Sequence, residues 1–154
     1  MKVALLSEKQ KIDHVFSLAN KLDADEETIS HWARYLCILT SGLIENSVRI
    51  MISNYATSRS HPNIAKYVKK HSRRISNLNS ERLKQLLGAF SDEWRSSFEL
   101  ALTDEQKDAI NSISANRNSI SHGRAVGITL VRIRNYYDKI HEVLKWICEE
   151  CILK

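Results

Sequence analysis

Glycine and proline are scarce in this chain, and their scarcity limits the folds that it can adopt. The 154 residues include four Gly and one Pro. Folds rich in strands need many tight turns, and tight turns need residues that tolerate special backbone dihedral angles. We therefore expect long helices joined by short connections. The length is that of one globular domain, so residues 1–154 are expected to form a single all-α domain.

Apolar residues recur at helical spacing along most of the chain and indicate five or six helices and no strand. The expected helices cover about 7–22, 26–57, a short basic segment opened by His61-Pro62, a segment capped by Asn79 or Ser80 and reaching Trp94, a segment from Thr103 to Gly123, and about 129–152. The second is apolar on nearly every side over residues 35–52, which is typical of a central helix. The last carries an apolar stripe that indicates lengthwise packing in a bundle.

Several classes of protein are disfavoured by the sequence. No stretch approaches the roughly 20 consecutive apolar residues of a membrane span, and the apolar run at residues 3–6 is too short for a signal peptide. We therefore expect a cytoplasmic protein with no membrane partner. Three Cys make a poor disulfide framework. Cys37 is expected in the core, and the lone pair Cys148 and Cys151 lacks further ligands at zinc spacing, so we expect no metal and no cofactor.

An arginine interrupts the apolar stripe of the helix expected to end at Gly123. The stripe consists of Ile110, Ile113, Arg117 and Ile120. A guanidinium that faces a core costs several kcal/mol unless it meets a carboxylate, a phosphate or water. His122 follows five residues later, which in a helix is a rotation of about 140°. We expect the turn at the helix end to bring His122 back beside Arg117.

A candidate binding site for a phosphate and a ribose is formed by Arg117, Asn118 and His122. Arginine holds phosphate oxygens with a planar fork of donors, and histidine moves protons near neutral pH. In the structural alternative, Arg117 extends from the stripe to solvent and His122 makes a favourable contact with the helix dipole. Periodicity by itself favours this structural alternative.

The segment from Ala115 to Gly123, ANRNSISHG, resembles the R-x4-6-H signature of the HEPN superfamily. Asn118 matches the preference of that family for a polar residue after the Arg, and the final Gly resembles the branch called RiboL-PSP-type HEPN. Residues 42–49 resemble the second helix of this branch, and the last helix, from Thr129 to Tyr136-Tyr137, is also similar. The resemblance covers most of the chain and is weakest at about residues 59–100.

This resemblance implies a four- to five-helix bundle that forms a homodimer, with two motifs in one composite cleft. It also implies metal-independent RNA cleavage that leaves 2′,3′-cyclic phosphate and 5′-OH ends, because the attacking oxygen belongs to the substrate. His122 would act as the general acid or base, Arg117 would hold the scissile phosphate and stabilise developing charge, and Asn118 would orient one of them.

One position departs from the related toxins that are paired with nucleotidyltransferase antitoxins. Those toxins carry a Tyr, the site of AMP attachment, two residues after the His, and this chain has Arg124 there. The departure argues against control by AMPylation and leaves any antitoxin unidentified.

Glu45 is a carboxylate in the otherwise apolar middle of the expected second helix. In the HEPN family an acidic or polar residue at this point faces the motif, so Glu45 is a candidate to fix Arg117 or His122. The alternative is an ordinary Glu45–Arg49 pair at i, i+4, worth a few tenths of a kcal/mol. The sequence favours neither interpretation.

Residues 66–74 contain the densest positive charge in a chain whose net charge is +5. Such a segment would give RNA a salt-sensitive affinity, and its Tyr67 could stack on a base. The alternative is a solvated charged face. The candidate substrate-binding residues are Lys69, Lys70, Arg73, Arg74, Arg124 and Arg132, with Arg134 as a further phosphate contact if the last helix packs on the motif helix.

These observations predict a HEPN endoribonuclease with an RNA substrate, acting as the toxin or effector of an antiviral defence or toxin–antitoxin system of prokaryotes. An antitoxin or regulatory protein would be its partner. The alternative is a non-catalytic HEPN module that binds RNA, a nucleotide or a protein. The intact set Arg117, Asn118 and His122 favours the enzyme, and the lack of another assignable catalytic group favours the module.

Overall fold

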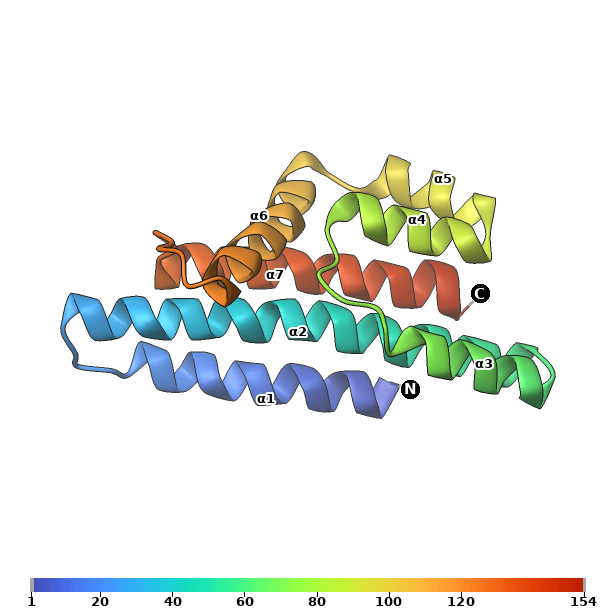
Figure 1. Ribbon diagram of the computed structural model, residues 1–154, viewed down its shortest axis with the longest axis horizontal. Coiled ribbons are helices and arrows are strands. Elements are labelled where there is room, and N and C mark those ends of the chain that lie inside the picture. Colours follow the sequence, from blue (N-terminus) through green and yellow to red (C-terminus); the bar gives the residue numbers. More distant parts are fainter. Residues whose placement is uncertain (1, 154) are drawn as a thin grey trace.

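The computed structural model describes residues 2–153, and all regular structure in that range is helical. The elements are α1 (Lys2–Asn20), α2 (Glu26–Arg59), α3 (Pro62–Ser72), α4 (Ser80–Phe90), α5 (Asp92–Ala101), α6 (Asp104–Ser121), α7 (Leu130–Trp146) and a π-helical segment, η1 (Ile147–Ile152). Helices α1, α2 and α7 lie lengthwise beside one another, α6 crosses α2 and α7, and α4 and α5 form a pair above α7 (Figure 1). The all-α fold expected from the sequence is confirmed.

Helix α2 is the centre of the bundle and contacts α1, α3, α6, α7 and η1. It begins where expected, because the side chain of Asp25 accepts a hydrogen bond from the Thr28 N–H at 2.7 Å. By length and composition alone α2 could cross a membrane, but more than half of its most apolar stretch is buried inside the bundle. That burial is typical of a core helix.

The segment expected to form one helix up to Trp94 is two helices, which raises the number of α-helices to seven among residues 2–153. Ser91 separates them. Its backbone is extended, with φ −160° and ψ 129°, and its N–H ends α4 by donating to the Leu87 carbonyl. Its side chain accepts from the Trp94 N–H at 3.4 Å and so caps α5. A serine that satisfies a free N–H at a helix start favours a new helix over continuation.

Helices α6 and α7 begin as the sequence predicts. Thr103 and Gln106 form the expected capping box, with reciprocal side-chain to backbone hydrogen bonds of 3.2 and 3.1 Å. Thr129 caps α7. The expected apolar stripe of the last helix is buried at Ile133, Tyr137, Ile140, Leu144, Ile147 and Cys151. The helix changes to π geometry at Ile147, so that the Leu153 N–H donates to the Cys148 carbonyl five residues back.

Tyr137 connects α7 to α1 at the edge of the core. Its ring packs against Phe16 with a centroid separation of 4.8 Å, and its hydroxyl donates to Asp13 Oδ1 at 2.7 Å. Burial and the neighbouring carboxylate raise the pKa of Tyr137. Burial alone would raise the pKa of Asp13, but hydrogen bonds from Lys9 and Tyr137 outweigh it and hold that pKa below its usual value.

We predict that Tyr137→Phe lowers the free energy of unfolding by about 1–2 kcal/mol at pH 7, because it removes a hydrogen bond to an ionised carboxylate. A lowered pKa stabilises the folded state above the unfolded pKa of Asp, about 3.9, and this stabilisation is lost as the pH falls through the folded value. The difference between the two proteins should therefore shrink toward about pH 3 in urea denaturation followed by circular dichroism.

Tyr136→Phe is the matched control. Tyr136 is also buried in α7, and its hydroxyl forms no hydrogen bond with residues 2–153. Equal losses of stability in the two variants would contradict the role assigned to the Tyr137 hydroxyl.

Candidate functional site

The motif from Arg117 to His122 occupies the C-terminal end of α6. The helix ends at Ser121, His122 is its C-cap with φ −97° and ψ 13°, and Gly123 has a positive φ of 68°. The Arg124 N–H donates to the Ser119 carbonyl at 2.9 Å. This pattern is a Schellman ending, in which a left-handed glycine reverses the chain and satisfies carbonyls at the helix end.

His122 lies before this reversal and keeps to the helical path. Its N–H still donates to the Asn118 carbonyl at 3.2 Å, one turn back. A helical separation of five residues places Arg117 and His122 about 140° apart around the axis and about 7.5 Å apart along it. The turn expected to bring His122 back beside Arg117 begins only after His122, at Gly123. The two side chains form no hydrogen bond with each other in the described chain.

Arg117 is half-buried, and it forms no hydrogen bond or ion pair with any residue of the described range 2–153. Asn118 and His122 are exposed. The guanidinium reaches solvent from the apolar stripe and is free to bind an anion. Arg117 therefore has the accessibility that a phosphate ligand needs, with no carboxylate of its own protomer to compete.

Glu45 is 9% exposed and binds the connection between α3 and α4. Its Oε1 accepts a hydrogen bond of 2.6 Å from the Asn77 N–H, and its Oε2 lies 3.5 Å from Arg49 Nη2. The i, i+4 pair considered from the sequence is thus present. Within residues 2–153, Glu45 forms no hydrogen bond or ion pair with Arg117 or His122.

Asn77, which binds Glu45, is also hydrogen-bonded to α6. It is a non-glycine residue with a positive φ of 49°, a conformation that asparagine tolerates better than most residues. Its Oδ1 accepts a hydrogen bond of 2.9 Å from the Ser114 hydroxyl, three residues before Arg117. Glu45 therefore affects the motif helix indirectly. It accepts a hydrogen bond from the Asn77 N–H, and the Asn77 side chain accepts one from Ser114 of α6.

A polar hollow of about 360 Å³ lies beside the motif, between the start of α4 and α6. It is lined by Asn77, Asn79, Ser80, Glu81, Asn111, Ser114, Ala115 and Asn118. Asn111, Asn118 and His122 are spaced by seven and four residues and share one face of α6. Our sequence reasoning missed this amide-rich face, although the spacing was a readable signal. Each amide offers both donors and an acceptor.

Arg34 of α2 is a second arginine that the sequence reasoning missed. Its Nε is buried without a hydrogen-bond partner among residues 2–153. It lies three residues before Cys37, whose thiol donates to the Ile113 carbonyl of α6 at 3.8 Å. Helix α6 runs down toward the N-terminal half of α2 (Figure 1), and the Cys37 contact joins the stretch of α2 that carries Arg34 to the helix that carries Arg117. An arginine within an apolar helix was the available signal.

The cysteines have the character of core thiols. Cys37, Cys148 and Cys151 are buried and none is in a disulfide. Burial raises the pKa of Cys37 to about 12, so its thiol stays protonated at neutral pH. No group of three or more His, Cys, Asp or Glu side chains in the described part of the chain is arranged to hold a metal ion.

The candidate substrate-binding residues fall into two groups. Lys69 and Lys70 are exposed on α3, and Arg73 and Arg74 are exposed just after it. Helix α3 lies at the far end of the bundle from the motif (Figure 1). The connection that leaves Arg74 leads within three residues to Asn77, at the hollow. The chain thus leads directly from the basic segment to the hollow beside the motif, but the basic segment and the motif do not lie side by side.

The second group lies close to the motif along the chain. Arg124 is exposed directly after the Schellman turn. Arg132 is exposed in the first turn of α7, with its guanidinium 5.9 Å from the centre of the Tyr136 ring. Arg134 is already engaged, since it pairs with Asp138 at 3.4 Å and lies over the Phe16 ring. Arg124 and Arg132 are therefore the better placed of these cations for a ligand.

Comparison with known proteins gives one match. The model of the family described as RiboL-PSP-HEPN matches residues 4–152, a range that includes Glu45, Arg117 and His122. The comparisons with curated proteins and with solved structures found no match.

We predict that Gly123→Ala destabilises the protein by about 1–2 kcal/mol, because alanine is strained at a φ of 68°. A Cβ at this position meets nothing within 4 Å, so the backbone conformation alone is tested. Gly127→Ala is the control, since a Cβ there is equally unobstructed and its φ is ordinary. Thermal denaturation of both variants measures the effect, and equal midpoints would refute the assigned strain.

Proposed function

Because this chain belongs to the RiboL-PSP-HEPN family, we propose that it is a metal-independent endoribonuclease whose active site combines two protomers. HEPN domains are often of the RNase type. One observation carries the proposal: Arg117 has no partner among the described residues and is separated by about 140° of helical rotation from the exposed His122. Two groups needed at one phosphate are thus divided between two faces, and a second copy of α6 supplies the missing one.

The proposed reaction is an internal transfer at phosphorus. The 2′-oxygen of the substrate forms a bond to the adjacent phosphorus while the bond from phosphorus to the 5′-oxygen breaks. His122 of one protomer takes the 2′-OH proton as general base, and the leaving 5′-oxygen takes a proton from water. Arg117 stabilises the charge that develops on the phosphate oxygens. The products carry a 2′,3′-cyclic phosphate and a 5′-OH.

The surroundings of Arg117 suit a nucleotide substrate. Arg34, three residues from the Cys37 contact with α6, is our candidate for a second guanidinium at the phosphate. The hollow beside Asn118 offers amide and hydroxyl groups that match the hydrogen-bonding edge of an unstacked base. We assign the hollow to the nucleotide next to the scissile phosphate. Arg124, Arg132 and the basic segment at residues 66–74 bind the flanking phosphates.

The biological setting that we propose rests on family membership and not on the geometry. In this setting the protein is the cytoplasmic toxin or effector of a prokaryotic defence or toxin–antitoxin system, restrained by an antitoxin or regulatory protein. Arg124 stands where related toxins carry the AMP-accepting Tyr, so restraint here would use another contact.

The central prediction is cleavage of RNA without metal. Purified protein incubated with total tRNA in EDTA should produce fragments with 2′,3′-cyclic phosphate ends, detected by end-specific ligation. His122→Ala and Arg117→Ala should each lower the rate by about 100-fold or more, because each removes a group that acts in the transition state. The exposed residues His14 and Arg95 provide matched controls, and their Ala variants should retain full activity.

Mixing the two inactive variants tests the composite site. In a mixed dimer, the His122→Ala protomer supplies Arg117 and the Arg117→Ala protomer supplies His122, so one of two sites is complete. An equal mixture after subunit exchange should regain about a quarter of wild-type activity, since half of the dimers are mixed. No recovery, despite confirmed exchange, would mean that each protomer works alone. Unchanged binding of RNA with no cleavage by any protein would favour the non-catalytic binding module.

Arg34→Ala should weaken the binding of a short uncleavable RNA by about 10-fold, because it removes a cation that we assign to the phosphate site. The slope of log affinity against log salt should also fall by nearly one phosphate contact. Arg34→Lys should restore part of the salt dependence, because it keeps the charge. If Arg34→Ala behaves as Arg95→Ala does in fluorescence anisotropy, Arg34 has no part in the site.

A further inference from the structure

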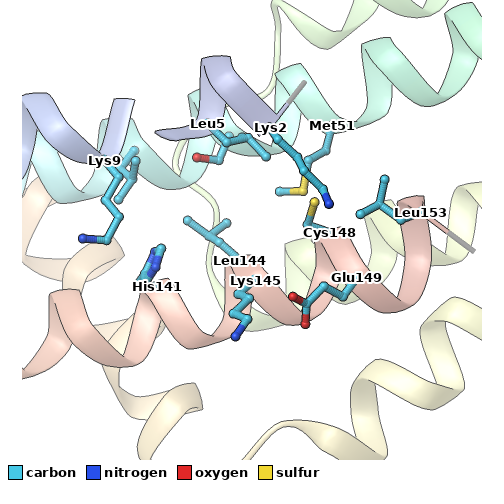
Figure 2. A pocket seen from close by; sticks show the side chains of 12 residues that line it. Lys2, Leu5, Lys9, Met51, His141, Leu144, Lys145, Cys148, Glu149 and Leu153 are labelled. Atoms are coloured by element: carbon cyan, nitrogen blue, oxygen red, sulfur yellow. The ribbon is translucent and has the colours of Figure 1, made fainter. Parts of the chain in front are cut away.

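A cavity of about 300 Å³ lies between α1, α2 and the last helix, and none of its lining residues comes from α6 (Figure 2). Its interior is mostly apolar and includes Leu5, Leu43, Met51, Leu144, Cys148 and Leu153. Small-molecule sites in proteins have this character: an apolar interior with a few polar groups at defined places. The cavity is separate from the hollow beside Asn118 and has no part in the proposed cleavage.

The rim of this cavity is basic. Lys2, Lys9 and Lys145 surround it together with His141, and Glu149 is the one acidic side chain among the lining residues within 2–153 (Figure 2). Lys2 and Lys145 form no hydrogen bond or ion pair with any described residue, while Lys9 is paired with Asp13. Burial lowers the pKa of His141, and the positive charges of Lys9 and Lys145 add to that effect. The rim thus favours an anion.

The π-helical segment η1 shapes one wall. The Leu153 N–H donates to the Cys148 carbonyl at 3.1 Å, and both side chains line the cavity. Residues five apart in an α-helix point about 140° away from each other, whereas the i→i+5 bond of a π turn brings them onto one side. The π turn of the last helix therefore places the side chains of Cys148 and Leu153 on the same wall of the cavity.

We propose that this cavity binds a medium-chain carboxylate, with the acyl chain along the apolar interior and the carboxylate at Lys2 and Lys145. An apolar cavity of about 150 Å³ accommodates benzene, with its six carbons. The cavity of about 300 Å³ accordingly fits a chain of about eight to ten carbons. The basic rim selects the charged head over a neutral one.

Titration calorimetry of the full chain with decanoate tests the proposal. We expect one site per protomer with a Kd of about 100 µM or tighter. Butyrate should bind at least 10-fold more weakly because it leaves the interior unfilled. Decanol and decyltrimethylammonium should also bind at least 10-fold more weakly because they lack the negative head. Equal binding of decanol and decanoate, or no saturable binding of decanoate, overturns the proposal.

Two variants locate the site. The double variant Lys2→Glu with Lys145→Glu should weaken decanoate binding by at least 10-fold, and both residues are exposed, so the fold should tolerate the change. Lys21→Glu with Arg95→Glu makes the same change of charge at exposed positions away from the cavity and should bind as the wild type does. Leu5→Trp places a bulky ring at the cavity and should also weaken binding. Similar losses in both double variants would indicate only a general charge effect and overturn the assignment.

Discussion

The structure depends on the burial of one helix of 34 residues, α2, which contributes 13 buried residues to the interior of the bundle. Helices α1, α3, α6 and α7 all pack directly on it. Burial of apolar surface on this scale drives the assembly of the bundle. It also sets a strict requirement, because each polar group on α2 that leaves water must find a partner inside the protein or become available to a ligand.

The polar residues of α2 meet this requirement in two ways, and the candidate site follows from them. Glu45 is paired: it accepts hydrogen bonds from Arg49 and from the Asn77 N–H, and Asn77 then holds Ser114 of α6. The Nε of Arg34 has no partner within residues 2–153. A buried carboxylate therefore fixes the position of the motif helix, while the buried Nε atoms of Arg34 and Arg49 form no hydrogen bond within the described residues.

Helix α6 explains why a second protomer enters the proposed mechanism. Its periodicity places Arg117 toward the core side and places Asn111, Asn118 and His122 on another face. In an α-helix of 3.6 residues per turn, positions five apart point about 140° away from each other, and the Schellman reversal comes only after His122. The proposed mechanism therefore takes one group from each of two copies of α6. The rigidity of the helix would hold each group in place before a substrate arrives.

The sequence by itself determined the features that depend on neighbouring residues: the caps at Asp25, Thr103 and Thr129, the central character of α2, and the placing of Arg117 in an apolar stripe. Local reasoning failed at Ser91, where apolar spacing continued through a position that a serine cap interrupts. Only the tertiary structure decided that Glu45 meets Asn77, 32 residues away, that Cys37 of α2 contacts Ile113 of α6, and that three helices enclose a lysine-rimmed cavity. Helix caps and apolar stripes depend on residues within a few positions of each other. Contacts between distant side chains, and cavities, depend on how helices far apart in the sequence pack.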